Sequence, residues 1–385
     1  MMVFLVVFGA VLGSAHYYLW VRLVRAPAWP APWSTVGTVA LVLAWAALMA
    51  SFLLMRTSAR TLASVTSWVS FTWLGCLFVL FTITALGDLG RFVAGFVSHA
   101  GNAAADPERR VFVSRMFAGL VGSMGAVTSA LALRQGLVRP RVHEMRLALT
   151  GLPGAAGSAS KPYRVVQLTD VHVGPTIGRA FIEDLVARVN ALEPDLIAIT
   201  GDLVDGSVKD LGDHVAPLGK LRAREGVFFV TGNHEYYSGA LEWTRFIASL
   251  GITVLRNERS ELPSGIIVAG VDDASSRGMN GDPGPDYEKA LGGLDPARFV
   301  LLLAHQPKAI VEAARRAVNL QLSGHTHGGQ IFPWNFLVRL QQPYNVGLFD
   351  HEGTKLYVSP GTGYWGPPMR LGTRSEITCL ELVPA

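Results

Sequence analysis

Two histidines stand two residues apart in the segment Leu-Gln-Leu-Ser-Gly-His-Thr-His-Gly-Gly-Gln, which covers residues 320–330. The apolar run 320–323 predicts a buried strand that ends at Gly324. In the glycine-lined turn that follows, His325 and His327 can direct both imidazoles at one point. Neutral imidazole is the commonest metal ligand, so the turn is a candidate metal site. Alone, a His-x-His pair is equally compatible with a polar turn.

Four other predicted strands end in polar residues of the same kinds. After strands at 163–168, 196–200, 227–231 and 299–304, the chain continues as Asp170-Val171-His172, Gly201-Asp202-Leu203-Val204-Asp205, Gly232-Asn233-His234-Glu235 and His305. Any one of these segments could be a helix cap, a turn or a core histidine. All five together are improbable as an accident, and α/β folds gather their ligand residues beyond the carboxyl ends of strands. We therefore expect one site built from five segments.

The residue types in these segments indicate what the site could bind. Carboxylates, one amide oxygen and several imidazoles together suit borderline divalent metals such as Mn, Fe or Zn. One shared carboxylate can hold two such ions ~3.5–4 Å apart, a spacing used for in-line phosphoryl displacement. We therefore expect two divalent metal ions, whose identity stays open, and a phosphorylated substrate.

The order of the five motifs resembles that of the calcineurin-like metallophosphoesterases, and in particular their membrane-associated members. The resemblance covers residues 161–385, and it includes the Gly-His-Thr-His-Gly-Gly-Gln form of the last motif and the tail segments 359–363 and 369–372. It implies an α/β fold of four layers, an α-β-β-α sandwich in which two sheets are flanked by helices. The alternation of predicted strands with a helix at 181–192 is in keeping with this.

The resemblance also implies a role for each motif residue. The seven implied metal ligands are Asp170, His172, Asp202, Asn233, His305, His325 and His327. Asp170, His172 and His327 would hold one ion, and Asn233, His305 and His325 would hold the other. Asp202 would bridge the two ions. No ligand of the pattern is missing, which favours an active enzyme over a degenerate relative.

Three further motif residues stay outside the implied ligand set. His234 would be the catalytic histidine, a residue that does not bind metal and faces the substrate phosphate and its leaving group. Asp205 and Glu235 are expected to support the ligands from outside, since the ligand positions are already filled. Aromatic and apolar residues follow the site motifs at Trp334, Phe336–Leu337 and Trp365. We expect these to pack against the second sheet rather than to form a rim around the site.

The N-terminal third of the 385-residue chain has a different, more apolar composition. The chain is 50% hydrophobic and only 16% charged, with a mean hydropathy of +0.33, which indicates a membrane part joined to a globular part. Four apolar stretches, at 1–21, 36–55, 64–86 and 111–133, each reach the ~20 residues that span a bilayer. Positive charge follows the first stretch instead of preceding it, so the stretch is a span rather than a signal peptide.

The predicted spans carry hardly any ionisable side chains. Within them, His16 and Arg115 are the only His, Asp, Glu, Lys or Arg residues, and each lies near a span end, whereas transporters place such groups along a substrate path at mid-membrane. The spans therefore indicate an anchor rather than a permease. The predicted domains are a four-helix transmembrane anchor over 1–135, a linker over 136–161, of which 151–161 is glycine-rich, and a metallophosphoesterase domain over 162–385.

Charge gives less information about location and partners. The net charge is +4, yet the chain has no run of five basic residues, so we expect no nucleic-acid partner. Six arginines flank the spans on each side, so the positive-inside rule does not decide the orientation. We expect a multi-pass protein of the cell membrane, with the cytoplasmic face as the preferred side for the catalytic domain. The partners are then the lipid bilayer and a small-molecule or lipid phosphoester substrate.

These observations predict a membrane-anchored phosphoesterase that depends on two metal ions. It would hydrolyse phosphoester or pyrophosphate bonds, with a lipid-linked substrate as one possibility. One alternative is a nucleotide or protein phosphatase of the same fold. The other is a membrane scaffold or transport protein whose globular domain binds metal without catalysis; the complete ligand pattern and the lack of charge at the centre of the spans speak against it.

Overall fold

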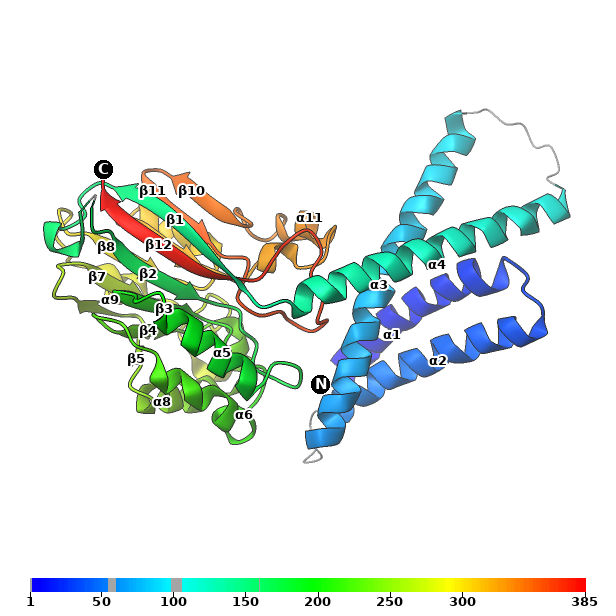
Figure 1. Ribbon diagram of the computed structural model, residues 1–385, viewed down its shortest axis with the longest axis horizontal. Coiled ribbons are helices and arrows are strands. Elements are labelled where there is room, and N and C mark those ends of the chain that lie inside the picture. The colour runs from blue at the N-terminus through cyan, green and yellow to red at the C-terminus, as the bar shows by residue number, and fades with distance from the viewer. Residues whose placement is uncertain (1, 55–59, 98–105, 159) are drawn as a thin grey trace. The chain divides into compact units, whose positions relative to one another are not determined.

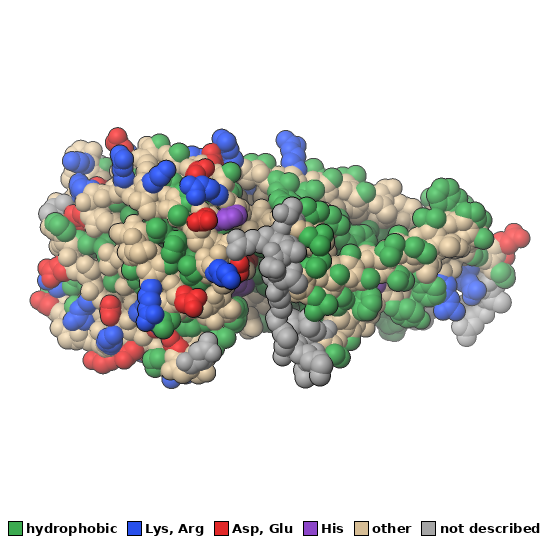
Figure 2. Space-filling model, turned by 90° about the horizontal axis from the view of Figure 1, so that it is seen from below, with side chains coloured by type: hydrophobic (Ala, Val, Ile, Leu, Met, Phe, Trp, Pro, Cys, Tyr) green, Lys and Arg blue, Asp and Glu red, His purple; other side chains and the backbone are tan. Residues whose placement is uncertain are grey.

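The computed structural model describes residues 2–54, 60–97, 106–158 and 160–385. The chain divides into two compact units. The first comprises residues up to Leu137 together with Gly366–Met369, and the second comprises Val138–Trp365 with Arg370–Ala385. On the face that Figure 2 shows, hydrophobic side chains gather over the helical unit, whereas Lys, Arg, Asp and Glu are spread over the other unit. This contrast agrees with the division into an apolar and a globular part that the composition predicts.

Long helices make up the first unit (Figure 1). They are α1 (Met2–Leu19), which continues as a π-helical segment η1 (Trp20–Arg25), then α2 (Ala31–Leu54), α3 (Arg60–Val97) and α4 (Pro107–Leu137). Each of the four is long and apolar enough to cross a membrane, which confirms the four predicted spans. Helix α3 is 38 residues long and extends well beyond the predicted span 64–86.

The extension of α3 adds a polar contact that the predicted spans do not contain. Asp88 accepts a hydrogen bond of 2.7 Å from the Tyr18 hydroxyl and pairs with the Arg22 guanidinium. His16 is buried, donates from Nδ1 to the Leu12 carbonyl, and accepts at Nε2 from the Trp73 indole N–H. The side chains of Asp88 and His16 are therefore both bonded to residues of another helix, as an apolar environment favours.

Two six-stranded sheets form the centre of the second unit. In spatial order the first sheet contains β1 (Arg141–Leu149), β12 (Glu376–Pro384), β2 (Tyr163–Leu168), β3 (Leu196–Thr200), β4 (Val227–Val230) and β5 (Thr253–Val254). The second contains β10 (Gly347–His351), β11 (Thr354–Val358), β9 (Leu320–Ser323), β8 (Val300–Leu303), β7 (Ile267–Gly270) and β6 (Glu258–Glu261). Strands β2 to β5 are parallel, as are β7, β8, β9 and β11.

Alternate side chains along each strand build two different cores. In β3, Leu196 and Ala198 join the core between the sheets, while Ile197 and Ile199 join the core beneath the helices. The helices on the first sheet are α5 (Arg179–Asn190), α6 (Val208–Val215) and α8 (Ala240–Ser249). Helices α9 (Tyr287–Leu291) and α10 (Ile310–Ala314) cover the second sheet in the same way. The unit is therefore the α-β-β-α sandwich that the resemblance implies.

Strand β1 requires a correction to the predicted linker over 136–161. Its nine residues pair in parallel with β12 along their whole length. Three of its residues are charged, namely Arg141, Glu144 and Arg146, because it lies at the edge of the sheet and one face is open to solvent. Its apolar content is therefore too low for its strand character to be evident without the partner. The outer boundaries of the predicted domains stay predictions.

Candidate metal centre and active site

Loops that follow the parallel strands bring the five motifs together at one site. Five of the seven predicted ligands hold left-handed backbone conformations, with φ between 50° and 68°: Asp170, His172, Asp202, His325 and His327. Such values are uncommon for residues other than glycine. Strained positions of this kind persist where the surrounding structure fixes them, commonly at functional sites. The backbone is therefore bent sharply to aim these side chains.

Asp170, His172 and His327 form the first cluster, with ligand atoms that all lie within 4.8 Å of one another. The Nε2 atoms of His172 and His327 are 3.0 Å apart, and His327 Nε2 lies 3.3 Å from Asp170 Oδ1. His172 donates its Nδ1–H to Asp205, at 2.9 Å, which leaves Nε2 as its ligand atom.

Asp202, His305 and His325 form the second cluster. His305 Nε2 lies 3.1 Å from Asp202 Oδ2 and 3.2 Å from His325 Nδ1. The Nδ1–H of His305 donates to the Thr200 carbonyl, which fixes the tautomer with Nε2 free. The side-chain oxygen of Asn233 is buried without a hydrogen-bond partner in the described part of the chain. A buried oxygen of this kind is costly unless a ligand compensates it, so it fits a metal ion.

Asp202 faces both clusters. Its Oδ2 atom lies 3.1 Å from His305 Nε2 and 3.9 Å from His172 Nε2, while Oδ1 accepts the backbone N–H of His234 at 2.9 Å. Burial would raise the pKa of this carboxyl group, but His305 and its other histidine neighbours hold it well below its usual value. The position and the charge of Asp202 both suit the predicted bridge between two cations.

The electrostatics of the histidines favour cation binding. Burial, together with the nearby His305, lowers the pKa of His325 to about 3, and burial and His172 hold that of His327 well below its usual value. Both rings are therefore neutral, as metal ligation requires. Burial would also lower the pKa of His305, but the carboxylates around it, Asp202 first, raise it well above its usual value. The same negative surroundings that hold a proton there would hold a metal cation. The donor set thus fits two divalent ions.

His234 and His172 share the carboxylate of Asp205. Asp205 Oδ1 accepts from His234 Nδ1 at 2.7 Å and from His172 Nδ1 at 2.9 Å, so these three residues form a hydrogen-bonded group. His172 and His234 lower the pKa of Asp205 to about 2 against the effect of burial. Asp202 and Asp205 in turn raise the pKa of His234 to about 9, although burial acts in the opposite direction. His234 is therefore protonated at neutral pH and can donate a proton from Nε2.

Glu235 links the loops that carry Asp202 and Asn233. The buried carboxylate accepts the backbone N–H groups of Asp202 at 2.9 Å, Leu203 at 2.8 Å and Gly232 at 2.6 Å. Burial, and then the charge of Asp202, raises the pKa of Glu235 to about 7. Glu235 therefore acts on the site through the backbone, which agrees with its expected position outside the ligand set.

Two aromatic side chains border His234. The ring of Tyr237 lies 5.3 Å from the imidazole centroid and that of Trp365 lies 5.5 Å away. Both are more than half exposed, and Gln330 fixes the Trp365 loop by a pair of hydrogen bonds to its backbone. Tyr237 could not be predicted from the sequence, although it stands only three residues after His234, because nothing in the spacing distinguishes it from its buried neighbour Tyr236.

Helix α11 (Trp334–Val338) corrects a further prediction. Trp334, Phe336 and Leu337 are 50%, 57% and 49% exposed, and no residue of the helix is buried. They do not pack against the second sheet, since α9 and α10 occupy its outer face. Instead, α11 packs on the turn that carries His327; a Cβ on Gly329 would overlap the backbone of Asn335. With Phe332 and Leu340, these residues form an exposed apolar surface next to the site, here called the apolar rim.

Arg370 is a supporting residue to which the sequence assigned no role. It is completely buried and donates to the carbonyls of Pro360, Gly363 and His327 at 2.7–3.3 Å. Burial lowers its pKa to about 10, which still leaves it charged. The similarity of the tail segment 369–372 to the family was a signal that this residue matters, but the carbonyls it joins lie in separate loops.

Replacement of Arg370 by lysine should destabilise the site loops. Lysine keeps the charge, but a single ammonium group cannot reach the carbonyls that the planar guanidinium joins. We expect a loss of about 1–3 kcal/mol in the free energy of unfolding, the usual cost of leaving a buried polar group unpaired. Thermal unfolding of the full-length protein in detergent would measure it, with the exposed Arg245→Lys as control. Equal melting temperatures for the two variants would contradict this role.

Comparison with known proteins gives the same result as the fold and the site. Residues 163–329 match the family model described as calcineurin-like phosphoesterase. The transmembrane protein with metallophosphoesterase domain of Danio rerio is 34% identical over 99% of this chain and 89% of that protein. The protein of the same name in Bos taurus is 44% identical over 67% of this chain and 61% of that protein. An uncharacterized metallophosphoesterase of Helicobacter pylori strain J99 is 42% identical over 65% of this chain and 66% of that protein.

The alignment with the Danio rerio protein extends over the apolar helices as well as the sandwich. Such an extent, at one-third identity, goes beyond a shared domain and agrees with the four spans and the sandwich described above. This chain therefore belongs to the calcineurin-like metallophosphoesterases, hydrolases that act on phosphoester bonds.

Proposed function

We propose that this membrane phosphoesterase cleaves a phosphoester or pyrophosphate bond of a lipid-linked substrate. The observation that carries the proposal is the apolar rim beside the candidate metal centre. Five large apolar side chains that stay 49–82% exposed are unusual on a globular unit, and such patches commonly mark binding surfaces. Acyl chains of a substrate in the membrane would cover this surface, while its phosphate lies at the metal centre.

The chemistry proposed for the site rests on the seven predicted ligands and on His234. Two divalent ions, when bound, would polarise the phosphoryl group and lower the pKa of a water molecule. Asp170, His172 and His327 would hold one ion, Asn233, His305 and His325 the other, and Asp202 both. His234, oriented by Asp205, would donate a proton to the leaving oxygen from Nε2. The protein that carries out this reaction would be a multi-pass protein of the cell membrane.

The test compares two substrates that differ only in chain length. The full-length protein in mixed micelles would be given a long-chain phospholipid or lipid phosphomonoester and its short-chain, water-soluble analogue, with Mn, Fe or Zn added in turn. Substitution of Phe336 by serine should lower kcat/KM for the long-chain substrate by roughly 10–100-fold, since burial of a phenylalanine contributes about 1.5–3 kcal/mol. The short-chain substrate should be affected less than twofold.

Val311→Ser is the matched control, because Val311 is 40% exposed but lies on α10, outside the apolar rim. An equal effect of Phe336→Ser on both substrates would show that Phe336 supports the fold rather than acyl chains. If the wild-type protein hydrolyses both substrates equally well, the lipid-linked proposal is wrong even though the phosphoesterase activity stands.

A nucleotide phosphatase is the second candidate. Tyr237 and Trp365 border His234 with exposed rings, and exposed aromatic faces can stack on nucleobases. A higher kcat/KM for nucleoside phosphates than for any lipid phosphate, abolished in Trp365→Ala, would favour this candidate over the first.

A further inference from the structure

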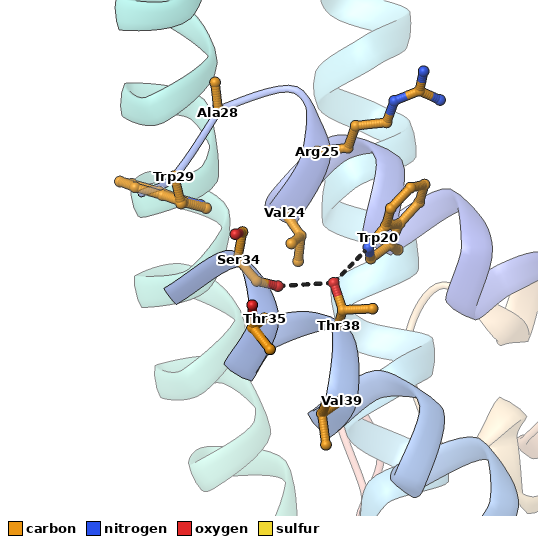
Figure 3. A pocket seen from close by; sticks show the side chains of 9 residues that line it. All are labelled: Trp20, Val24, Arg25, Ala28, Trp29, Ser34, Thr35, Thr38 and Val39. Atoms are coloured by element: carbon orange, nitrogen blue, oxygen red, sulfur yellow. Dashed lines mark hydrogen bonds between the residues drawn. The ribbon is translucent and has the colours of Figure 1, made fainter. Parts of the chain in front are cut away.

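Helices α1 and α2 of the membrane unit enclose two hollows that meet side by side. The first, of about 390 Å³, is lined at its polar side by Arg25, Ser34, Thr35 and Thr38, and by Trp20 and Trp29 (Figure 3). The second, of about 460 Å³, is almost wholly apolar and is lined by Gly13, His16, Tyr17, Trp20, Thr38, Leu41, Val42 and Trp45. Because Trp20 and Thr38 line both, the two form one continuous α1–α2 groove.

Hydrogen bonds within the protein hold the tryptophan side chains that line the groove. Trp20 donates its indole N–H to Thr38 Oγ1 at 2.9 Å, which joins η1, the continuation of α1, to α2 (Figure 3). Trp45 donates to the Gly9 carbonyl at 3.1 Å, and Trp29 donates to the Leu23 carbonyl at 2.9 Å. All three indole N–H groups are satisfied internally, so their rings present apolar faces. The groove is therefore preformed, as small-molecule sites usually are.

The two halves of the groove differ in polarity along the helix axis. Arg25 closes the first span, at the level where arginine and tryptophan meet lipid headgroups. Gly13 lies seven positions before Trp20, which is ~10 Å deeper at 1.5 Å per residue. The polar half thus lies at the headgroup level and the apolar half within the hydrocarbon region. A lipid in a bilayer likewise has its polar headgroup at the surface and its acyl chains in the hydrocarbon region.

Arg25 supplies a positive charge that no carboxylate among the described residues neutralises. Arg22, three residues earlier, pairs with Asp88, and Arg115 donates to the carbonyls of Pro27 and Ala28. Arg25, by contrast, has no carboxylate within ion-pair distance among the described residues; its guanidinium carbon lies 5.8 Å from the ring of Trp20. The Thr35 hydroxyl, which lines the same hollow, likewise has no hydrogen-bond partner in the part of the chain that the structure describes. A phosphate group complements both donors.

We propose that the α1–α2 groove binds one phosphate-bearing anionic membrane lipid, with an acyl chain in the apolar half and the phosphate beside Arg25. This site lies within the membrane unit and is separate from the metal centre. Its occupancy does not depend on hydrolysis, so it is tested without any measurement of activity.

Native mass spectrometry of the full-length protein in a neutral detergent can count bound lipids during a titration. Phosphatidylglycerol and phosphatidylcholine with identical acyl chains are the two probes. We expect one saturable phosphatidylglycerol per chain and weaker binding of phosphatidylcholine. Arg25→Gln should raise the Kd for phosphatidylglycerol roughly fivefold, since one arginine near an anionic headgroup contributes about 1 kcal/mol. It should weaken phosphatidylcholine binding less, because the choline cation offsets the charge of the phosphate.

Two variants test the apolar half. A Cβ on Gly13 would already contact the Trp45 ring at 3.5 Å, so Gly13→Leu should fill the hollow and abolish binding of both lipids. Val42→Trp fills it from α2 and serves if Gly13→Leu does not fold. The controls are Arg109→Gln, an exposed arginine of α4, and Gly119→Leu, a glycine of the same helix whose Cβ meets no atom within 4 Å.

Three outcomes would overturn the proposal. Equal losses in Arg25→Gln and Arg109→Gln would mean a general attraction of anionic lipid to basic residues. Equal Kd values of the wild-type protein for the two lipids would show that the site does not select a net anionic headgroup. Binding that does not saturate, or that survives both Gly13→Leu and Val42→Trp, would mean that lipid surrounds the helices without occupying the groove.

Discussion

Replacement of Asp202 by asparagine is expected to remove metal and activity together, with turnover lower by roughly 10³-fold or more. Asp202 Oδ2 faces His305 Nε2 at 3.1 Å and His172 Nε2 at 3.9 Å, so one carboxylate serves both halves of the site. Asparagine would place either a neutral oxygen or an NH₂ group there. Since Asp170 is the only other carboxylate in the predicted ligand set, half of the negative charge opposing two cations would be lost.

The fold should survive this substitution. Asparagine has nearly the shape of aspartate, and its Oδ1 can still accept the backbone N–H of His234. Elemental analysis of purified full-length protein, together with thermal unfolding, would therefore separate loss of metal from loss of structure. Asp213→Asn is the control, because Asp213 is exposed on α6. Two metal ions per chain, retained at wild-type affinity in Asp202→Asn, would contradict the bridging role.

The strands that carry the motifs could be predicted from the sequence because they are buried on both faces. β2, β3 and β9 have the same bounds in the structure as in the apolar runs 163–168, 196–200 and 320–323. A strand covered by a helix layer on one side and a second sheet on the other has apolar residues at nearly every position. Its ends are then marked by the first polar residue, and in this chain those polar residues are the predicted site.

Edge strands could not be predicted in the same way. β1 is charged on one face, and its partner β12 lies more than 200 residues away in the chain, so neither its limits nor its pairing is visible locally. The edge strand β10 of the second sheet is similarly exposed, with no fully buried residue. The sequence also suggested an end to the third span at residue 86, where Gly87 and Asp88 follow, yet α3 continues because Arg22 and Tyr18 from another helix satisfy Asp88.

For the candidate site as well, the sequence indicates the residues but not their tertiary contacts. Motif spacing placed the seven ligands and His234 at strand ends, but it gave no contact between side chains. Asp205 accepts hydrogen bonds from both His172 and His234. Arg370 joins the His327 turn to the loop at 360–363. Both arrangements depend on loops that meet only in the folded chain. The exposure of α11 depends in turn on which helices already cover the second sheet. Sequence patterns predict which residues react; tertiary contacts determine which residues support them.

Replacement of His234 by asparagine is expected to lower turnover by ~10²–10⁴-fold while metal content and folding stay intact. His234 lies outside the predicted ligand set and donates its Nδ1–H to Asp205, so its free Nε2 is available to a substrate. The control is His351→Asn, since His351 lies on β10 and bonds to the hydroxyl of Tyr344, away from the metal centre. A loss of metal in His234→Asn alone would show that His234 is itself a ligand.

The dependence on the leaving group would then identify what His234 does. Its pKa is raised to about 9 by Asp202 and Asp205, against the effect of burial, so it holds a proton that a departing alkoxide needs. Nitrophenolate needs little protonation, so the loss caused by His234→Asn should shrink for nitrophenyl esters and be largest for alkyl esters. A loss of the same size for both would mean that His234 stabilises charge on the phosphoryl oxygens instead. Undiminished rates on alkyl esters, with full metal content, would remove His234 from the mechanism, and Asp205 would then serve to orient His172 alone.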